Sequence, residues 1–257
     1  MLDDLFAGAI ADASARQALR PLGDVERDAL SRLPSLDARA ALQPTDRVKI
    51  IAEVKRASPS RGALSEIADP ASLASSYETG GASAISVLTE GRKFKGSLRD
   101  LEAVREVVSV PVLRKDFIAT PYQVFEARAA GADLVLLIVA GLEQATLVEL
   151  HELILDLGMT ALIETHSADE VVRGLDAGAT VLGVNARNLT TFDLDQDLFA
   201  SLADGIPSGV VRVAESAVKT PADVAHYRRA GADVVLVGEA LVIHGDPITA
   251  LNSFLEA

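Results

Sequence analysis

The sequence predicts an α/β fold in which short buried strands alternate with helices. Three observations support this fold class. A helix-to-strand pattern recurs four times, four further apolar segments lie between the repeats, and the hydrophobic residues are almost all aliphatic. Of the 257 residues, 49% are hydrophobic but only 4% are aromatic, and there is no tryptophan. Aliphatic strands of this kind are typical of parallel sheets that are covered by helices.

The recurring unit is a helical pattern that ends in Gly-Ala and continues into an apolar strand. The four strands read GGASAISVL from Gly80, AGADLVLLI from Ala130, AGATVLGV from Ala177 and AGADVVLVG from Ala230. Each helix is predicted to begin after a capping side chain, and proline fills the first helical position in three of them. These caps are Asp69, Thr120, Ser167 and Thr220. A glycine then ends each helix.

Four further strands are predicted between the repeats. They read KIIAEV from Lys49, VPVLRKDF from Val110, MTALIETH from Met159 and VVRVAES from Val210. Alternating the two sets gives eight strands, each followed by a helix. A doubly wound open sheet would also alternate strands and helices, but the glycine-rich turn of a dinucleotide fold is missing after the first strand. Eight units of about 25 residues favour a closed (β/α)8 TIM barrel.

The first 46 residues form an N-terminal helical extension. Leucine, isoleucine and valine recur there at roughly helical spacing, and Pro21, Pro34 and Pro44 interrupt the pattern. We expect two or three short helices that pack onto the barrel. No Gly/Ser linker follows them, so residues 1–257 are interpreted as one domain, of which 1–46 is the extension.

The composition excludes several classes of protein. Lysine and arginine number 24 against 37 acidic residues, a net charge of −13, which argues against a nucleic-acid surface. No apolar run approaches the ~18 residues of a membrane span. The N-terminus carries acids where a secretory signal would carry lysine or arginine. Because cysteine is absent, there is no disulfide framework or thiolate nucleophile. We expect a cytoplasmic protein that contacts neither membrane nor nucleic acid.

The first barrel strand ends in an acid and a base. In IIAEVKRASPSRG, which begins at Ile50, Glu53 and Lys55 lie two residues apart and should point to the same face of the strand. A long connection of residues 56–69 follows, and long loops in compact domains are usually functional or disordered. We interpret this loop, with Ser58, Arg61 and Gly62, as a lid over a substrate.

Charged side chains also follow most of the other strands. Barrel enzymes carry their chemistry at the carboxyl ends of the strands. The residues predicted there are Thr89, Glu90, Lys115, Asp116, Glu164, His166, Asn185, Arg187, Glu215, Ser216, Gly238 and Glu239. Two lysines, several carboxylates, an amide and a guanidinium would therefore converge on one mouth.

Lys55, Lys115 and Glu164 are the strongest catalytic candidates. Lysines could simply extend from the barrel rim into water, but each of these two ends an apolar run where burial gains it nothing. Such a lysine can donate a proton, bind an anion or form a Schiff base. Glu164 could be a rim carboxylate paired to a lysine, yet partial burial would also suit a general base. Glu53 is interpreted as the partner that keeps a lysine charged and oriented.

The ends of the last two strands are candidates for binding phosphate. Ser216 and the VGEA segment from Val237 lie where barrels often hold this anion with backbone N–H groups. Gly238 would allow close approach, and Glu239 would contribute its amide rather than its side chain. The four histidines share no metal-ligand spacing. We expect His151 and His226 on the surface and His166 in a solvated loop.

Seven motifs in order resemble the indole-3-glycerol phosphate synthase family of tryptophan biosynthesis. They are IAEVKRASPSRG, VLTEGRKFKGS, PVLRKDFI, LIETH, GVNARNL, VAES and LVGEALV. The resemblance extends from Val48 to about Leu251, and the family also carries an N-terminal helical extension. It implies ring closure, decarboxylation and dehydration of 1-(2-carboxyphenylamino)-1-deoxyribulose 5-phosphate. This chemistry calls for acids, a base and cations, with no metal or redox cofactor.

The resemblance also implies a role for each site residue. Lys115 would be the main general acid and Glu164 the general base, while Lys55 would bind anionic groups or donate a proton instead. The supporting residues fall into three sets. Glu53 and Asn185 would orient the lysines and substrate hydroxyls; Ser58, Arg187, Phe94, Phe117 and Leu189 would bind the substrate; and Ser216, Ala217, Gly238 and Glu239 would bind phosphate. Ala217 stands where the family usually has glycine, so a positive φ there would strain the loop.

Other interpretations remain open at this point. A phosphoribosylanthranilate isomerase would need a cysteine, and the chain has none. A Schiff-base aldolase could use Lys115. An inactive barrel that only binds ligands should have lost one or more of Lys55, Lys115 and Glu164, and all three are present. The expected partner is a small phosphorylated substrate, bound by a monomer, with transient association with other enzymes of the tryptophan pathway as an alternative.

Overall fold

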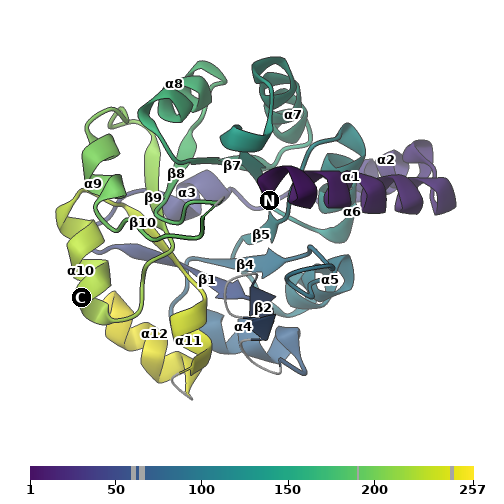
Figure 1. The fold of residues 1–257 in the computed structure, drawn as a ribbon. Coiled ribbons are helices and arrows are strands. Elements are labelled where there is room, and N and C mark those ends of the chain that lie inside the picture. The colour runs from purple at the N-terminus through teal and green to yellow at the C-terminus, as the bar shows by residue number, and fades with distance from the viewer. Residues whose placement is uncertain (59–61, 64–66, 190, 244–245) are drawn as a thin grey trace.

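The protein is a closed barrel of eight parallel strands with helices around it (Figure 1). The structure is a computed structural model that describes residues 1–58, 62–63, 67–189, 191–243 and 246–257, without the side chains of Ser58, Ala63 and Ile243. The barrel strands are β1 (Lys49–Val54), β4 (Ala84–Leu88), β5 (Val112–Lys115), β6 (Leu134–Ile138), β7 (Thr160–Thr165), β8 (Val181–Asn185), β9 (Val211–Glu215) and β10 (Val234–Val237).

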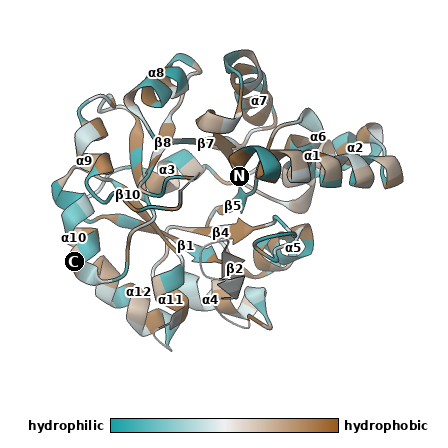
Figure 2. Ribbon diagram, in the orientation of Figure 1, coloured by the Kyte–Doolittle hydropathy of each residue, from teal (hydrophilic) through white to brown (hydrophobic). Residues whose placement is uncertain are grey.

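The strands follow each other around the barrel in chain order, and β1 closes it by pairing with both β4 and β10. Their residues are almost entirely buried, because the interior and the helix layer cover opposite faces. Figure 2 shows the hydrophobic character of the strands. The predicted (β/α)8 barrel is therefore confirmed, including the start of β1 at Lys49.

The helices of the four repeats begin at the predicted caps. They are α4 (Pro70–Thr79), α6 (Pro121–Ala130), α8 (Ala168–Asp176) and α10 (Pro221–Arg229). After each helix a glycine adopts nearly the same left-handed conformation, with φ of 96°, 94°, 94° and 93° at Gly81, Gly131, Gly178 and Gly231. The repeat in the sequence thus reflects one turn geometry used four times.

The remaining helices complete the outer layer. They are α5 (Leu98–Val107), α7 (Gln144–Asp156), α9 (Leu198–Ala203), α11 (Glu239–Ile243) and α12 (Pro247–Leu255), with a 3-10 turn η1 (Val139–Gly141) after β6. A two-stranded antiparallel ribbon, β2 (Ala57–Ser58) with β3 (Gly62–Ala63), lies in the connection after β1. Arg61 and parts of the predicted lid fall outside the described residues.

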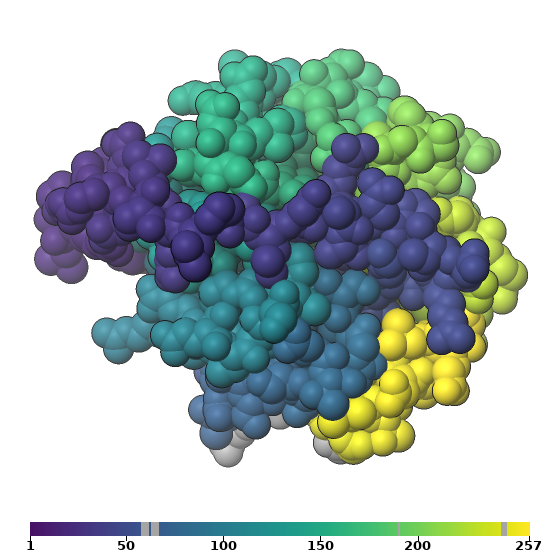
Figure 3. All heavy atoms as spheres, turned by 180° about the vertical axis from the view of Figure 1, so that it is seen from behind, coloured from purple at the N-terminus to yellow at the C-terminus, as the bar shows by residue number. Residues whose placement is uncertain are grey.

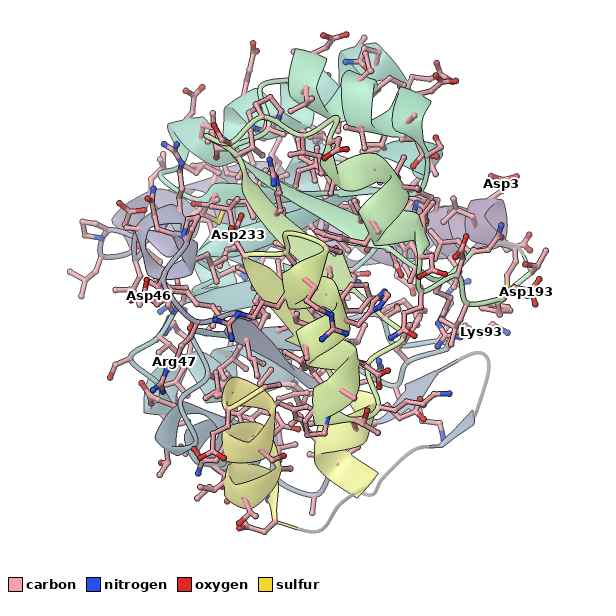
Figure 4. The ribbon with its side chains drawn as sticks, turned by 90° about the vertical axis from the view of Figure 1, so that its left-hand side faces the viewer. Asp3, Asp46, Arg47, Lys93, Asp193 and Asp233 are labelled. Atoms are coloured by element: carbon pink, nitrogen blue, oxygen red, sulfur yellow. The ribbon has the colours of Figure 1, made fainter. Side chains whose placement is uncertain are left out.

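The N-terminal extension contains three helices, α1 (Leu2–Leu19), α2 (Leu22–Ser31) and α3 (Ala38–Leu42). Each ends before one of the three prolines, as predicted, but α1 is longer than the short helices expected. Viewed from behind, this segment (purple to dark blue) runs across the molecule from one side to the other (Figure 3). A side view places Asp3 of α1 near Lys93 and Asp193, whereas Asp46 lies at the opposite end with Asp233 (Figure 4).

Helix α1 therefore lies beside the mouth of the barrel. Phe6 packs edge-on against Phe117, with ring centroids 5.6 Å apart. It also fills the space over Gly141, where a Cβ atom would lie 1.9 Å from the Phe6 ring. Arg16 binds Glu126 of α6 at 2.6 Å. These contacts fix the extension to the loops that carry the site.

Candidate active site

A cavity of about 460 Å³ opens at the carboxyl ends of the strands. It is lined by every residue to which the resemblance gives a role, except Ser58, whose side chain lies outside the described part. Of the other strand-end residues predicted at the mouth, Thr89, Glu90 and His166 do not line it. The predicted residues in its lining are Glu53, Lys55, Phe94, Lys115, Phe117, Glu164, Asn185, Arg187, Leu189, Ser216, Ala217, Gly238 and Glu239. Residues that are far apart in the sequence thus meet because parallel strands end together.

Lys115 lies at the centre of the charged floor. Its Nζ is 3.2 Å from Oε2 of Glu164 and 3.6 Å from Oε2 of Glu215. The lysine side chain is 15% exposed, and each carboxylate is 1% exposed. Burial would lower the pKa of Lys115, but the nearby carboxylates outweigh it and raise that pKa above its usual value. Lys115 is therefore an ammonium group with a proton available to an acceptor in the cavity.

The two carboxylates beside Lys115 differ in their proton affinity. Burial alone would raise the pKa of Glu164, yet the Lys115 ammonium and His166 lower it below its ordinary range. The pKa of Glu215 instead rises to about 8, because of burial and the Glu164 charge. Glu215 therefore binds a proton more tightly than Glu164 does. Environments that separate the pKa values of neighbouring carboxyl groups are typical of acid–base sites.

The sequence places Glu215 at the end of a strand but does not indicate a role for it. The structure brings it into the site because Gly183 leaves room for it. A Cβ atom on Gly183 would lie 2.1 Å from Oε1 of Glu215. The signal in the sequence was a glycine within the strand VLGVN, which marks a close approach of other atoms.

Glu53 and Lys55 form the ion pair that the sequence suggested. Lys55 Nζ donates to Oε1 of Glu53 at 2.5 Å, and Ser86 donates to the other oxygen at 3.4 Å. Gly238 makes space for this pair, since a Cβ atom there would lie 2.7 Å from Glu53 and 3.2 Å from Lys55 Nζ. The glycine that follows β10 therefore limits the position of the lysine that follows β1.

A buried polar cluster outside the barrel fixes the strand end that carries Lys115. Neighbours along a strand point to opposite faces, so Arg114 and Asp116 face the helix layer. Arg114 is fully buried and donates to Asp116 at 3.0 Å, to the backbone of Gln123 at 2.7 Å and to Thr89 at 3.2 Å. Buried charges that are fully hydrogen-bonded in this way hold a backbone firmly.

Part of the cavity lining is apolar. Phe94 and Phe117 pack with ring centroids 6.1 Å apart, and Leu189 lines the same space. Buried Glu90 accepts hydrogen bonds from the backbone of Arg92, Lys93 and Phe94 and so orders the loop that presents Phe94. An aromatic ring of a ligand would find a hydrophobic surface here and charges on the other side.

Asn185 is the last residue of β8, and Arg187 lies in the loop that follows. The side-chain oxygen of Asn185 accepts from the backbone of Arg187 at 3.0 Å, and Arg187 donates to the carbonyl of Phe192 at 3.3 Å. The asparagine also lies against Glu164, whose pKa it helps to lower. Both side chains are therefore oriented before any ligand binds.

The loop after β9 has an unusual backbone. Ser216 and Ala217 have φ of 69° and 57°, in the left-handed region that favours glycine. Tyr227 donates to the carbonyl of Ser216 at 3.3 Å and helps to hold the loop. The strain expected if Ala217 needed a positive φ is thus present.

The histidines correct part of the sequence interpretation. His166 is 13% exposed and lies between Glu164 and Glu170, so the prediction that it lies in a solvated loop was wrong. His151 is 3% exposed on the inner side of α7, so its surface position was also wrong. His226 is about one-third exposed and pairs with Asp197. Local sequence could not show which helix face or loop would be covered.

Within the described residues, no group of three His, Cys, Asp or Glu side chains is arranged to hold a metal ion. In the same part of the chain, no helix has the length and apolarity needed to cross a membrane.

The fold and the site define a class of protein: a (β/α)8-barrel enzyme with a buried lysine–glutamate pair in a partly apolar cavity. Solved structures with low sequence identity support the fold. A protein described as KGPDC from Streptococcus mutans aligns with a TM-score of 0.64 at 13% identity, over 82% of this chain and 97% of its own. An N-acetylmannosamine-6-phosphate 2-epimerase from Clostridium perfringens gives 0.63 at 16% identity, over 85% and 96%.

Sequence relatives identify the family. The family model for indole-3-glycerol phosphate synthase matches residues 2–254. Curated proteins of that name are 67% identical in Leifsonia xyli, over 99% of this chain and 97% of theirs, and 56% identical in Beutenbergia cavernae, over 100% and 95%. The chain belongs to the indole-3-glycerol phosphate synthase family. It is a carboxy-lyase of tryptophan biosynthesis that acts on a phosphorylated small molecule.

Proposed function

We propose that Lys115 is the main general acid and Glu164 the general base of indole ring formation. The observation that carries this proposal is their pairing at 3.2 Å on the buried floor of the cavity. A cationic acid and an ionised base then lie on the same side of any ligand in the pocket, each within reach of it.

Ring closure begins at the ribulose carbonyl of 1-(2-carboxyphenylamino)-1-deoxyribulose 5-phosphate. The ring carbon that bears the carboxylate attacks this carbonyl carbon, and Lys115 protonates the developing alkoxide to a hydroxyl. The carboxylate then leaves as carbon dioxide, and its bonding electrons restore the aromatic ring. The ammonium form of Lys115, which the charges of Glu164 and Glu53 favour, supports this first step.

Dehydration completes the indole. The hydroxyl formed in the first step leaves as water with a proton from a lysine, while Glu164 removes a proton from the indoline intermediate. Lys115 is the donor in our proposal, and Lys55 is the alternative. Lys115 loses its proton in ring closure, so it must be reprotonated before it acts again; the carboxyl of Glu215, 3.6 Å away and with a raised pKa, supplies that proton, and Glu164 later passes its own proton to solvent.

Lys55 binds anionic substrate groups in this proposal, and Glu53 orients it through the ion pair at 2.5 Å. Asn185 orients substrate hydroxyls, and Arg187 holds polar groups at the rim, together with Ser58. Phe94, Phe117 and Leu189 form the anthranilate pocket, which the apolar wall supports. Phosphate is bound at Ser216, Ala217, Gly238 and Glu239, all of which line the cavity.

The assay follows the appearance of indole fluorescence when the protein meets the carboxyphenylamino-deoxyribulose phosphate. The chain contains no tryptophan, so its own background in this spectral range is low. Glu164→Gln should lower turnover at least ~10²-fold, as is typical for a lost acid–base group. A normal rate would remove Glu164 from the mechanism. A substrate adduct trapped on Lys115 by borohydride would favour the aldolase alternative instead.

We further propose one domain, residues 1–257, with 1–46 as its extension, which the contacts of Phe6 and Arg16 with the barrel support. A cytoplasmic location, a monomeric state and transient association with other tryptophan-pathway enzymes remain predictions. Sedimentation of the purified protein tests the monomer.

A further inference from the structure

His166 follows β7 directly after the catalytic strand end and lies between two glutamates. On one side its backbone N–H donates to Oε2 of Glu170 at 2.8 Å, and its Nδ1 lies 3.2 Å from the same oxygen. On the other side its Nε2 is 3.4 Å from Oε1 of Glu164. The imidazole thus connects the first turn of α8 to the proposed general base.

Glu170 is itself held in place by the start of α8. Ser167 caps this helix and accepts from the backbone of Glu170 at 3.3 Å. The carboxylate of Glu170 reaches back past the cap and accepts from the backbone N–H of His166 at 2.8 Å. This fixes the imidazole ring from behind, on the side away from the cavity.

The contact with Glu164 joins two buried atoms that need partners. Neither Oε1 of Glu164 nor Nε2 of His166 has a hydrogen bond of ordinary geometry within the described residues. Leaving such groups unpaired costs about 1–3 kcal/mol each. Their separation of 3.4 Å needs only a small movement to become a hydrogen bond.

We propose that His166 is a positioning residue that holds Oε1 of Glu164, so that Oε2 faces Lys115 and the substrate. This inference rests on the proposed role of Glu164 as the base. The two oxygens of the Glu164 carboxylate then have different partners. The imidazole of His166 fixes Oε1, whereas Oε2 contacts Lys115 and can leave it to accept a proton from the substrate.

The electrostatics of the cluster are compatible with this role. Burial would lower the pKa of His166, but Glu164 and Glu170 outweigh it and raise the pKa to about 10. The charged groups that face the ring are Glu164 from β7 and Glu170 from α8, and Glu164 in turn faces Lys115 from β5 and Glu215 from β9. His166 therefore acts as a fixed cation throughout the neutral range.

The test compares His166→Asn with a matched control. His226→Asn removes an imidazole whose Nε2 also lies 3.4 Å from a carboxylate, that of Asp197, outside the cavity lining. For His166→Asn we expect kcat to fall about tenfold and KM to change less than twofold. The acid limb of the kcat profile should move about one pH unit higher, because Glu164 loses a cation. His166→Gln should recover part of the rate, and His226→Asn should leave both unchanged.

A second measurement separates this proposal from the role of Glu164. The pKa of His166, followed by ring-proton NMR, should fall by more than about one unit in Glu164→Gln, whatever the turnover of that variant. An unchanged His166 pKa, or a normal pH profile in His166→Asn, would overturn the positioning role. A normal rate in Glu164→Gln would instead overturn the base assignment. If His166→Asn does not fold, Glu170→Gln removes the anchor and should shift the acid limb in the same direction.

Discussion

Lys115 on β5 and Glu164 on β7 form an ion pair of 3.2 Å that spans the intervening strand β6. Strand β6 allows this because it ends in aliphatic residues, LVLLI, and contributes no charged side chain to the mouth. The acid and the base therefore neutralise each other until a ligand separates them. In the proposed mechanism, a substrate carbonyl that takes the Lys115 proton leaves Glu164 with only His166 as a cationic neighbour, and that makes the carboxylate a stronger base for the next step.

Lys115→Met tests the acid. The variant keeps the length and apolar stem of the side chain but has no proton to donate, so turnover should fall at least ~10²-fold. The measurement is initial rate by indole fluorescence at saturating substrate. Lys93→Met, which alters an exposed lysine at the rim, is the control and should have a normal rate. Near-normal turnover in Lys115→Met would refute the assignment.

Gly238→Ala tests the coupling between β10 and the Lys55–Glu53 pair. An added methyl would lie 2.7 Å from Glu53 and 3.2 Å from Lys55 Nζ, so the pair must move. Because Lys55 is the proposed anion-binding group, KM should rise about tenfold, equivalent to about 1.4 kcal/mol of lost binding, while kcat changes less. Gly209→Ala, which meets nothing within 4 Å, should leave KM unchanged. An unchanged KM in Gly238→Ala would show that Lys55 does not contribute to substrate binding.

The Glu215→Gln variant should be more stable than the wild type by an amount that grows as the pH rises. The folded-state pKa of Glu215 is raised from 4.5 to about 8, so the folded protein retains a proton that the unfolded chain loses. Its contribution to stability is present below pH 4.5 and is lost as the pH rises towards 8. Glutamine cannot ionise, so the variant does not lose this contribution. Relative to the wild type, its free energy of unfolding should therefore rise across this window by at most about 1.4 kcal/mol per pH unit.

Urea unfolding at several pH values measures this difference. Glu152→Gln, exposed on α7, is the control and should give a difference that does not change with pH. A difference that is equally flat for Glu215→Gln would mean that Glu215 is ionised in the folded protein at neutral pH.

The architecture could be predicted because it is encoded locally and repeatedly. The caps at Thr120 and Thr220 and the glycines at 131 and 231 each act within a few residues of chain, and their spacing repeats. The strand-end site followed from topology, since parallel strands in a closed barrel bring their carboxyl ends together. Glu53, Lys115 and Glu164 could thus be assigned to one mouth without any coordinates.

What the sequence could not predict depends on contacts between distant segments. The burial of His166 requires Glu170 and Glu164 on either side of it, and a loop histidine carries no local sign of that. Phe6 at the mouth could not be found either, because its partners Phe117 and Gly141 lie more than 100 residues away. The raised pKa of Glu215 arises from burial beside Glu164, which is a property of the assembled floor.

Ala217 offers a direct test of strain in the proposed phosphate loop. Its φ of 57° puts a Cβ atom in the left-handed region, which costs an L-residue about 1–2 kcal/mol. Glycine removes that strain but loses more conformational freedom on folding, by about 0.5–1 kcal/mol. Ala217→Gly should therefore raise the free energy of unfolding by about 0.5–1 kcal/mol. Ala230→Gly, at a helix end with φ of −77°, has no such strain to relieve and should lower the free energy of unfolding.

If the loop needs its left-handed backbone to hold phosphate, Ala217→Gly should keep KM within about twofold, since glycine adopts the same conformation. A loss of stability in this variant would show that Ala217 has an ordinary backbone in solution.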